Sequence, residues 1–364
     1  MSTFPLSKAI QVLFFLFLVF AGLYFARAFL IPIAFAGLLS MLFLPLSRKM
    51  ENKGMKRALA TLLCILILLA AVAAIVSLLA WQVNDLAGDA EQMEQRVTQM
   101  INQFKQSINK NFGISPKRQE EILEQQASGA GGGSSIVSGF FGSIMGFLVD
   151  ALLVLVYIFL FMYFRRHLKT FILKLIPQAD KNNAQQIIHD TQQVAQQYLS
   201  GLGMMIVGLW IMYGIGFSIV GVKNAIFFAI LCGLLEIVPF VGNLTGNALT
   251  VLMAISQGGG FNMVLGIIIT YAIVQFFQTY ILEPLVVGAE VNINPLFTII
   301  IIVLGEMVWG IPGMILAIPL LGIVKIICDH IESLKPYGYL IGGEPKKKKS
   351  SGIVDKIKGW FGKK

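Results

Sequence analysis

Long apolar stretches with almost no charged residues constrain the fold of this 364-residue chain more than any other feature. The clearest are residues 12–46, 59–81 and 136–164, and about 20 apolar residues suffice for a helix to cross about 30 Å of hydrocarbon. Charged residues make up only 13% of the chain, against about 25% in average soluble domains. So few charges do not cover a soluble surface. The sequence therefore predicts an all-α, polytopic membrane protein.

The basic residues predict how the chain is oriented. Arg48, Lys49, Lys53, Lys56 and Arg57 follow the first two apolar runs, and short loops rich in Lys and Arg stay in the cytoplasm. We therefore expect both termini inside and the first turn outside, near residues 27–32. The net charge of +9 does not indicate a nucleic-acid partner, because ten of the 28 basic residues lie from position 325 onward and many others flank apolar runs.

Composition divides the chain into five regions. Residues 1–82 hold the first membrane helices, and 83–135 form an extracytoplasmic segment with an amphipathic helix and a Gly/Ser hinge. Residues 136–200 hold one more span, ending near 164, and a cytoplasmic helical linker. Residues 201–331 form a core of short-linked apolar segments. Residues 332–364 are expected to form a basic amphipathic tail on the anionic inner leaflet, the alternative being a disordered tail.

Two apolar segments in the core are broken in matching places. The predicted span 203–220 is followed by 224–256, which is interrupted by EIVPFVGN, and the oppositely directed span 261–282 is followed by 295–327, interrupted by EMVWGIPG. Arms of about 13 to 15 residues are too short to cross a bilayer. We therefore expect two re-entrant helical hairpins in an inverted repeat, beside about six full spans.

Paired interruptions of this kind indicate a transporter binding site near the membrane midplane. The alternative is that Pro and Gly only shape helix packing. Charge alone does not distinguish re-entrant arms from crossing ones, because both give the same side for the tail.

Ten residues of the core are candidates for a substrate or ion site. An ionisable group in hydrocarbon usually faces a cavity or a partner, so a carboxylate at each break could bind a cation or exchange a proton. The alternative is that it caps a helix N-terminus. Amide side chains on nearby helices could line a pathway for a small polar solute, or only hold the helices together. The ten candidates are Glu236, Pro239, Gly242, Asn243, Asn247, Gln275, Gln278, Glu306, Pro312 and Gly313.

Catalytic and metal-binding patterns do not stand out in the sequence. Cys64, Cys232 and Cys328 lie in or at the end of apolar segments without CxxC spacing, and the three histidines lack metal-ligand spacing. There is no evident Ser/His/Asp, HExxH or P-loop pattern either. We therefore expect a protein that is not an enzyme and that has no cofactor and no metal.

Several core motifs together resemble the autoinducer-2 exporter family of bacterial membrane proteins. They are GLLEIVPFVG at 233–242, YILEP at 280–284, NP at 294–295, WGIPGM at 309–314 and LAIP at 316–319, with YLSG at 198–201 before them. The resemblance implies a secondary transporter of the bacterial inner membrane that exports or exchanges small solutes. It also implies homo-oligomers and an elevator-like movement of the half that carries the hairpins.

The resemblance leaves the substrate open. Some members are associated with the quorum-sensing furanone autoinducer-2, and others with sodium(lithium)/proton antiport. Family members often have Pro where this chain has Asn243 and Leu249, which alters the tip of the first hairpin. A non-transporting membrane scaffold or regulatory protein is the alternative of another class.

Overall fold

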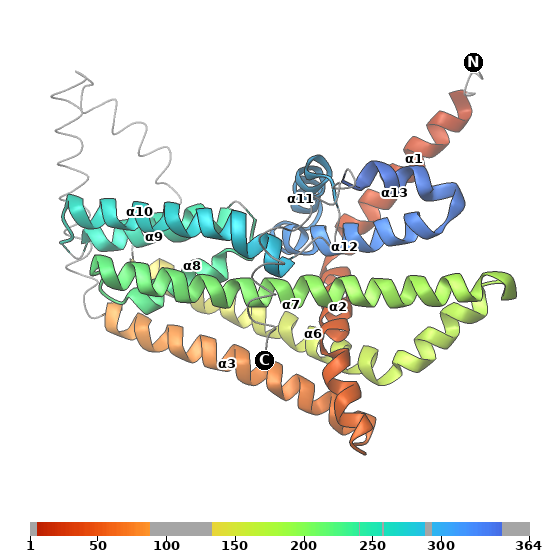
Figure 1. The fold of residues 1–364 in the computed structure, drawn as a ribbon, viewed down its shortest axis with the longest axis horizontal. Helices are drawn as coiled ribbons and strands as arrows, with labels where there is room; N and C mark the ends of the chain where they lie inside the picture. Colours follow the sequence, from red (N-terminus) through yellow and green to blue (C-terminus); the bar gives the residue numbers. More distant parts are fainter. Residues whose placement is uncertain (1–5, 88–132, 240, 257, 288–292, 344–364) are drawn as a thin grey trace, which may run out of the picture.

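The computed structural model describes residues 6–87, 133–239, 241–256, 258–287 and 293–343 (Figure 1). These residues are almost entirely helical, which confirms the prediction of an all-α protein. Most of the extracytoplasmic segment 83–135 and the amphipathic part of the C-terminal tail lie outside the described residues, so those two predictions stay predictions.

The N-terminal half contains four described helices. They are α1 (Leu6–Phe25), α2 (Arg27–Asn52), α3 (Arg57–Ala87) and α6 (Gly133–Leu175). The first turn is a single break at Ala26, one residue before the expected range 27–32, and Pro32 lies inside α2 and is buried there. Helices α2, α3 and α6 pack around a small apolar cluster of Ala36, Cys64, Ile158 and Met162.

Helix α7 (Lys181–Val220) is 40 residues long and joins two regions that the sequence analysis separates. The part of the expected cytoplasmic linker from Lys181 onward and the expected span 203–220 form one uninterrupted helix. The change from polar to apolar side chains alters the surroundings of a helix but does not break its backbone hydrogen bonds. The break falls instead at Pro177, which separates α6 from the 3₁₀ turn Gln178–Asp180 and α7.

Both predicted breaks are present, and each joins two helices that contact each other. The first hairpin consists of α8 (Ala225–Leu235) and α9 (Val241–Ser256), and the second of α11 (Pro295–Trp309) and α12 (Ile311–His330). Helix α10 (Phe261–Phe277) and the π-helical segment η2 (Gln278–Val287) lie between them in the chain.

Glycines allow the close approach of the arms in both hairpins. A Cβ atom on Gly242 would lie 1.6 Å from the carbonyl oxygen of Leu235. In the second hairpin, a Cβ on Gly313 would lie 1.9 Å from the carbonyl oxygen of Gly305, and Gly310 makes the turn with a φ of 65°. The two tips are therefore built on backbone-to-backbone contact.

Six helices in the described part of the chain are long and apolar enough to cross a membrane. They are 27–52, 57–80, 151–175, 178–220, 261–282 and 311–330. The expected number of spans is the same, but the set differs. The apolar stretch Ile10–Phe25 of α1 falls among the shorter helices, whereas α12, with 20 residues, is among the six. Helix α8, with 11 residues, is about 16 Å long and too short to cross. Whether the hairpins are re-entrant stays a prediction.

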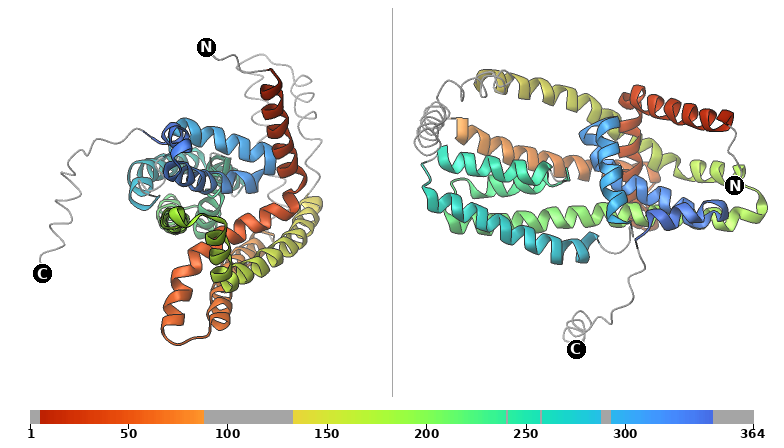
Figure 2. Two further views of the ribbon diagram at one scale, coloured as in Figure 1. Left: turned by 90° about the vertical axis from the view of Figure 1, so that its right-hand side faces the viewer. Right: turned by 90° about the horizontal axis from the view of Figure 1, so that it is seen from above.

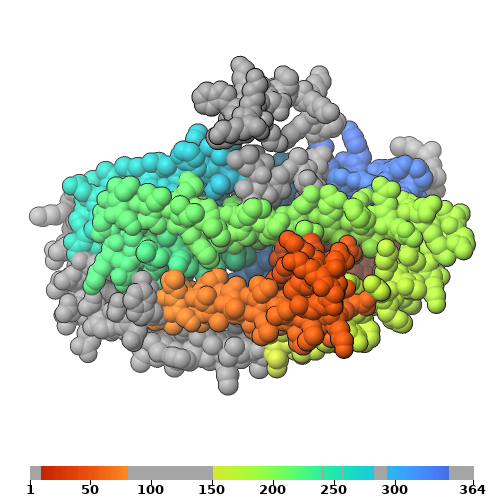
Figure 3. Space-filling view, turned by 60° about the horizontal axis from the view of Figure 1, so that its bottom comes forward, coloured from red at the N-terminus to blue at the C-terminus, as the bar shows by residue number. Residues whose placement is uncertain are grey.

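The two hairpins pack at different positions along α7. The first hairpin and α10 lie beside the C-terminal half of α7, around the buried side chains of Leu209, Tyr213 and Phe217 (Figures 1 and 2). The second hairpin packs farther back, where Leu316 meets Ala195 of α7 and Leu38 of α2. In the space-filling view, α7 lies between α10 and the N-terminal helices (Figure 3).

A buried polar cluster at the first hairpin

Polar side chains gather inside the apolar core formed by α7, α8, α9 and α10. Asn243, Asn247 and Gln278 are 7%, 9% and 2% exposed, and Tyr213 is fully buried. Buried polar groups are costly unless they are hydrogen-bonded, so their presence in an apolar bundle needs an explanation from their contacts.

Two asparagines on α9 form the centre of this cluster. Asn243 and Asn247 lie one helical turn apart, and Nδ2 of Asn247 donates to Oδ1 of Asn243 at 3.1 Å. Nδ2 of Asn243 donates to Oε1 of Gln275 on α10, and the hydroxyl of Tyr213 on α7 donates to Oδ1 of Asn243 at 3.5 Å. The side chains of α9 thus connect the hairpin to both neighbouring helices.

The carboxylate of Glu236 joins the cluster from the tip. It follows the last residue of α8, and its Oε1 accepts a hydrogen bond from Nε2 of Gln278 at 2.8 Å. Glu236 lies at the C-terminal end of α8, so it does not cap the N-terminus of that helix. Since a helix C-terminus carries partial negative charge, a carboxylate there attracts a cation or a proton.

Two buried oxygen atoms of the cluster have no hydrogen-bond partner among the described residues. They are Oδ1 of Asn247 and Oε1 of Gln278. More than 90% of buried polar groups in native proteins are paired, so two unpaired acceptors next to a carboxylate indicate a place for a polar ligand. Among the described residues, no group of three or more His, Cys, Asp or Glu side chains has the arrangement of a metal site.

The other candidates fall into two groups. Pro239 and Gly242 belong to the turn and the first turn of α9 in the same hairpin, where they shape the tip rather than join the hydrogen bonds. Glu306, Pro312 and Gly313 belong to the second hairpin, which lies elsewhere along α7.

Glu306 is exposed in the last turn of α11, so it does not cap the N-terminus of that helix either. The tip of this hairpin contacts α1 instead, because Nε1 of Trp309 donates to the carbonyl oxygen of Leu23 at 2.9 Å. The structure therefore brings together five of the ten candidates, Glu236, Asn243, Asn247, Gln275 and Gln278.

Tyr213 is a member of the cluster that the sequence analysis missed. It follows Leu209 by four residues and precedes Phe217 by four, so its position on α7 is in phase with apolar core residues. Only its hydroxyl distinguishes it from them. A buried Tyr hydroxyl usually finds a polar partner, and this is the signal that could have pointed to it.

Comparisons with known proteins agree with this architecture. The family described as AI-2E family transporter matches residues 13–333. YrrI of Bacillus subtilis, whose name describes a candidate transport protein, is 23% identical over 84% of this chain and 87% of its own length. YueF of the same organism is 24% identical over 89% and 93%, and YhhT of Escherichia coli K12 is 21% identical over 91% and 93%, and both carry the same description. This chain belongs to the AI-2E family of membrane transporters.

Proposed function

We propose that this protein is a secondary transporter that moves small polar solutes across the bacterial inner membrane through the buried polar cluster at the first hairpin. Export of an autoinducer-2-like solute is the proposed activity. The supporting observation is the cluster itself: one carboxylate, four amides and a tyrosine hydroxyl meet inside an otherwise apolar bundle.

The chemistry of the cluster suits a small uncharged solute rich in hydroxyl groups. Amide groups both donate and accept hydrogen bonds, and Asn247 and Gln278 each have an acceptor oxygen available. A ligand hydroxyl that donates to these oxygens would satisfy groups that are costly to bury unpaired. Apolar side chains around the cluster would exclude water from the bound solute.

The substitution Glu236→Gln tests this proposal in proteoliposomes. It keeps the size of the side chain but removes the charge that Gln278 contacts. A hydrogen bond to a charged group contributes about 1.5–3 kcal/mol, so we expect the flux of the furanone solute to fall about tenfold or more. Uptake into energised vesicles is the measurement.

Glu332→Gln is the matched control, because the Glu332 side chain is 87% exposed and its ion-pair partner among the described residues is the nearby Lys335. Its flux should equal that of the unchanged protein. Furanone flux that matches empty liposomes in the unchanged protein would contradict the export proposal. Stoichiometric capture of a partner protein, together with no flux of any solute, would favour a membrane scaffold.

Sodium(lithium)/proton antiport is the second candidate, and a separate observation favours it. Hard cations prefer oxygen ligands, and Glu236, Asn247 and Gln278 supply carboxylate and amide oxygens at one end of α8. The same vesicles loaded with a pH-sensitive dye test this activity. A sodium pulse should release internal protons in the unchanged protein and not in Glu236→Gln.

An elevator-like movement is the proposed mechanism, with the hairpin-bearing region 201–331, together with the rest of the continuous helix α7, moving against the N-terminal helices in a homo-oligomer. The polar cluster lies wholly within this region, on α7, α8, α9, α10 and η2. A site built within one moving unit can be carried across the bilayer without being dismantled. Glu306, Pro312 and Gly313, near the break of the second hairpin, would then belong to the substrate or ion path of the same unit.

A further inference from the structure

A second polar site lies far from the first hairpin, where the ends of α2 and α6 approach α7. A cavity of about 370 Å³ opens there, a size typical of ligand sites. Its lining residues are Leu44, Arg48, Glu51, Asn52, Arg165, Arg166, Lys169 and Gln192. Four of these side chains are cationic and one is anionic.

The one carboxylate in the cavity is already neutralised. Both oxygens of Glu51 accept hydrogen bonds from Nη2 of Arg165, at 2.8 and 2.7 Å, and Arg57 lies 3.8 Å away. Arg48, Arg166 and Lys169 have no ion-pair partner within the described residues. The cavity therefore presents uncompensated positive charge.

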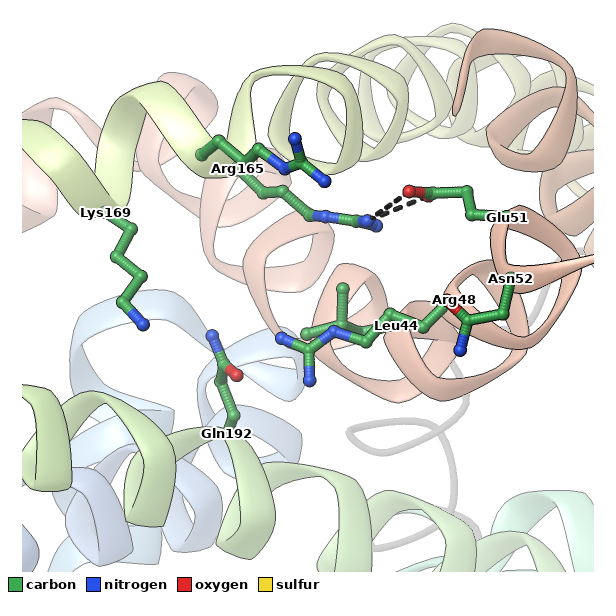
Figure 4. A pocket seen from close by; sticks show the side chains of 8 residues that line it. Leu44, Arg48, Glu51, Asn52, Arg165, Lys169 and Gln192 are labelled. Atoms are coloured by element: carbon green, nitrogen blue, oxygen red, sulfur yellow. Dashed lines mark hydrogen bonds and ion pairs between the residues drawn. The ribbon is translucent and has the colours of Figure 1, made fainter. Parts of the chain in front are cut away.

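The free cations come from different helices and converge. Figure 4 shows that Arg48 of α2, Lys169 of α6 and Gln192 of α7 extend into one space, whereas Arg165 turns to Glu51. Helices α6 and α7 both pack on α2 but have little contact with each other. An anion in this space would connect two helices that the fold leaves apart.

An adjoining cavity of about 340 Å³ shares Leu44, Arg48 and Gln192 with the first. Met41 and Pro45 of α2 give this cavity a small apolar wall, and His189, Gln193 and Gln196 of α7 add further polar groups to its lining. Positive residues at this end also predict that the site faces the cytoplasm.

We propose that this cavity binds a phosphate group, with Arg48 and Lys169 as its main ligands and Gln192 as a hydrogen-bonding partner. The phosphate can belong to an anionic phospholipid headgroup or to free inorganic phosphate. Guanidinium and ammonium groups are the usual protein partners of phosphate, and basic pockets between membrane helices on the cytoplasmic side bind anionic headgroups. The site is independent of the proposed transport cluster.

Lipid binding to the full chain tests the proposal. The protein is placed in phosphatidylcholine nanodiscs, and binding of a labelled phosphatidylglycerol is measured with the unchanged protein and with the double variant Arg48→Gln/Lys169→Gln. Each basic residue contributes several-fold to the affinity for an anionic lipid, so we expect about thirtyfold weaker binding for the double variant. Lys335→Gln, which removes one exposed charge elsewhere, should change it less than twofold.

Adding inorganic phosphate to this binding assay shows whether the phosphate group belongs to a phospholipid headgroup or to free inorganic phosphate. If millimolar phosphate displaces the labelled phosphatidylglycerol, and if phosphate binding also needs Arg48 and Lys169, the site binds free phosphate. If phosphate does not displace phosphatidylglycerol, and if the double variant no longer binds phosphatidylglycerol, the site binds the lipid headgroup. Because the loss of charge could disturb folding, Arg48→Lys/Lys169→Arg should restore binding. If the double variant binds both phosphatidylglycerol and phosphate as tightly as the unchanged protein, the proposal is overturned.

Discussion

Single residues with small side chains decide how tightly the two hairpins close. Gly242 lies against the carbonyl oxygen of Leu235, and Gly313 lies against that of Gly305. In both cases the neighbour is backbone, which cannot rotate away as a side chain could. Added volume must therefore separate the two arms.

The substitution Gly313→Ala should destabilise the protein by about 1–3 kcal/mol, because its new Cβ would overlap the Gly305 carbonyl and overpacking of this kind costs about that much. Gly37→Ala in α2 is the matched control, since a Cβ there meets nothing within 4 Å. SDS titration in mixed micelles gives the free energy of unfolding. Equal free energies for the two variants would show that the arms are not in close contact.

Glu51 and Arg165 form another residue-scale feature, and the two are 15% and 17% exposed. Their paired hydrogen bonds connect the end of α2 to α6, and Oγ of Ser47 also donates to Glu51 at 2.9 Å. Removing one partner from a largely buried ion pair leaves the other charge without compensation.

We expect Arg165→Gln to lower the free energy of unfolding by about 3 kcal/mol. The double variant Glu51→Gln/Arg165→Gln should lower it by clearly less than the sum of the two single changes. A double-mutant cycle measured by the same SDS titration should give a coupling of about 1–3 kcal/mol. Strict additivity of the two changes would mean that the pair contributes nothing to the fold.

At the scale of helices, the sequence predicted where the chain breaks better than where it continues. The breaks near Glu236 and at Gly310 follow from Pro and Gly, whose backbone effects are local. The continuity of α7 could not be read from hydropathy, because a helix that leaves the membrane keeps its hydrogen bonds and changes only its exposed side chains.

The candidate site was predictable only in part, for a related reason. Glu236, Asn247 and Gln278 attract attention as polar residues in apolar segments. Tyr213 does not, because its ring fits the apolar face of α7. The pair formed by Glu51 and Arg165 spans 114 residues of sequence, and no local pattern reports a contact over such a separation.

The described part of the molecule consists of an N-terminal group of helices and the hairpin-bearing region, which meet at the second hairpin and where α3 contacts α8. Leu38 of α2 and Leu316 of α12 are both buried in one apolar cluster at this contact. If region 201–331 moves during transport, these two residues must separate or slide.

A cross-link between Leu38→Cys and Leu316→Cys should therefore reduce solute flux to the level of empty liposomes, and a reductant should restore it. The background for this pair replaces the three native cysteines by Ala. As a control, Ala36→Cys cross-linked to the native Cys64 connects α2 and α3 within the N-terminal group and should leave the flux unchanged. Normal flux in the Leu38–Leu316 cross-linked protein would contradict the elevator-like movement.

The unbroken helix α7 has a mechanical consequence. At 40 residues it is about 60 Å long, and it touches the basic cavity at Gln192, the second hairpin at Ala195 and the polar cluster at Tyr213. If a rigid helix of that length tilts by about 5° around one end, its other end moves by about 5 Å. A force on the polar end of α7 would therefore be transmitted along the helix to the polar cluster at Tyr213.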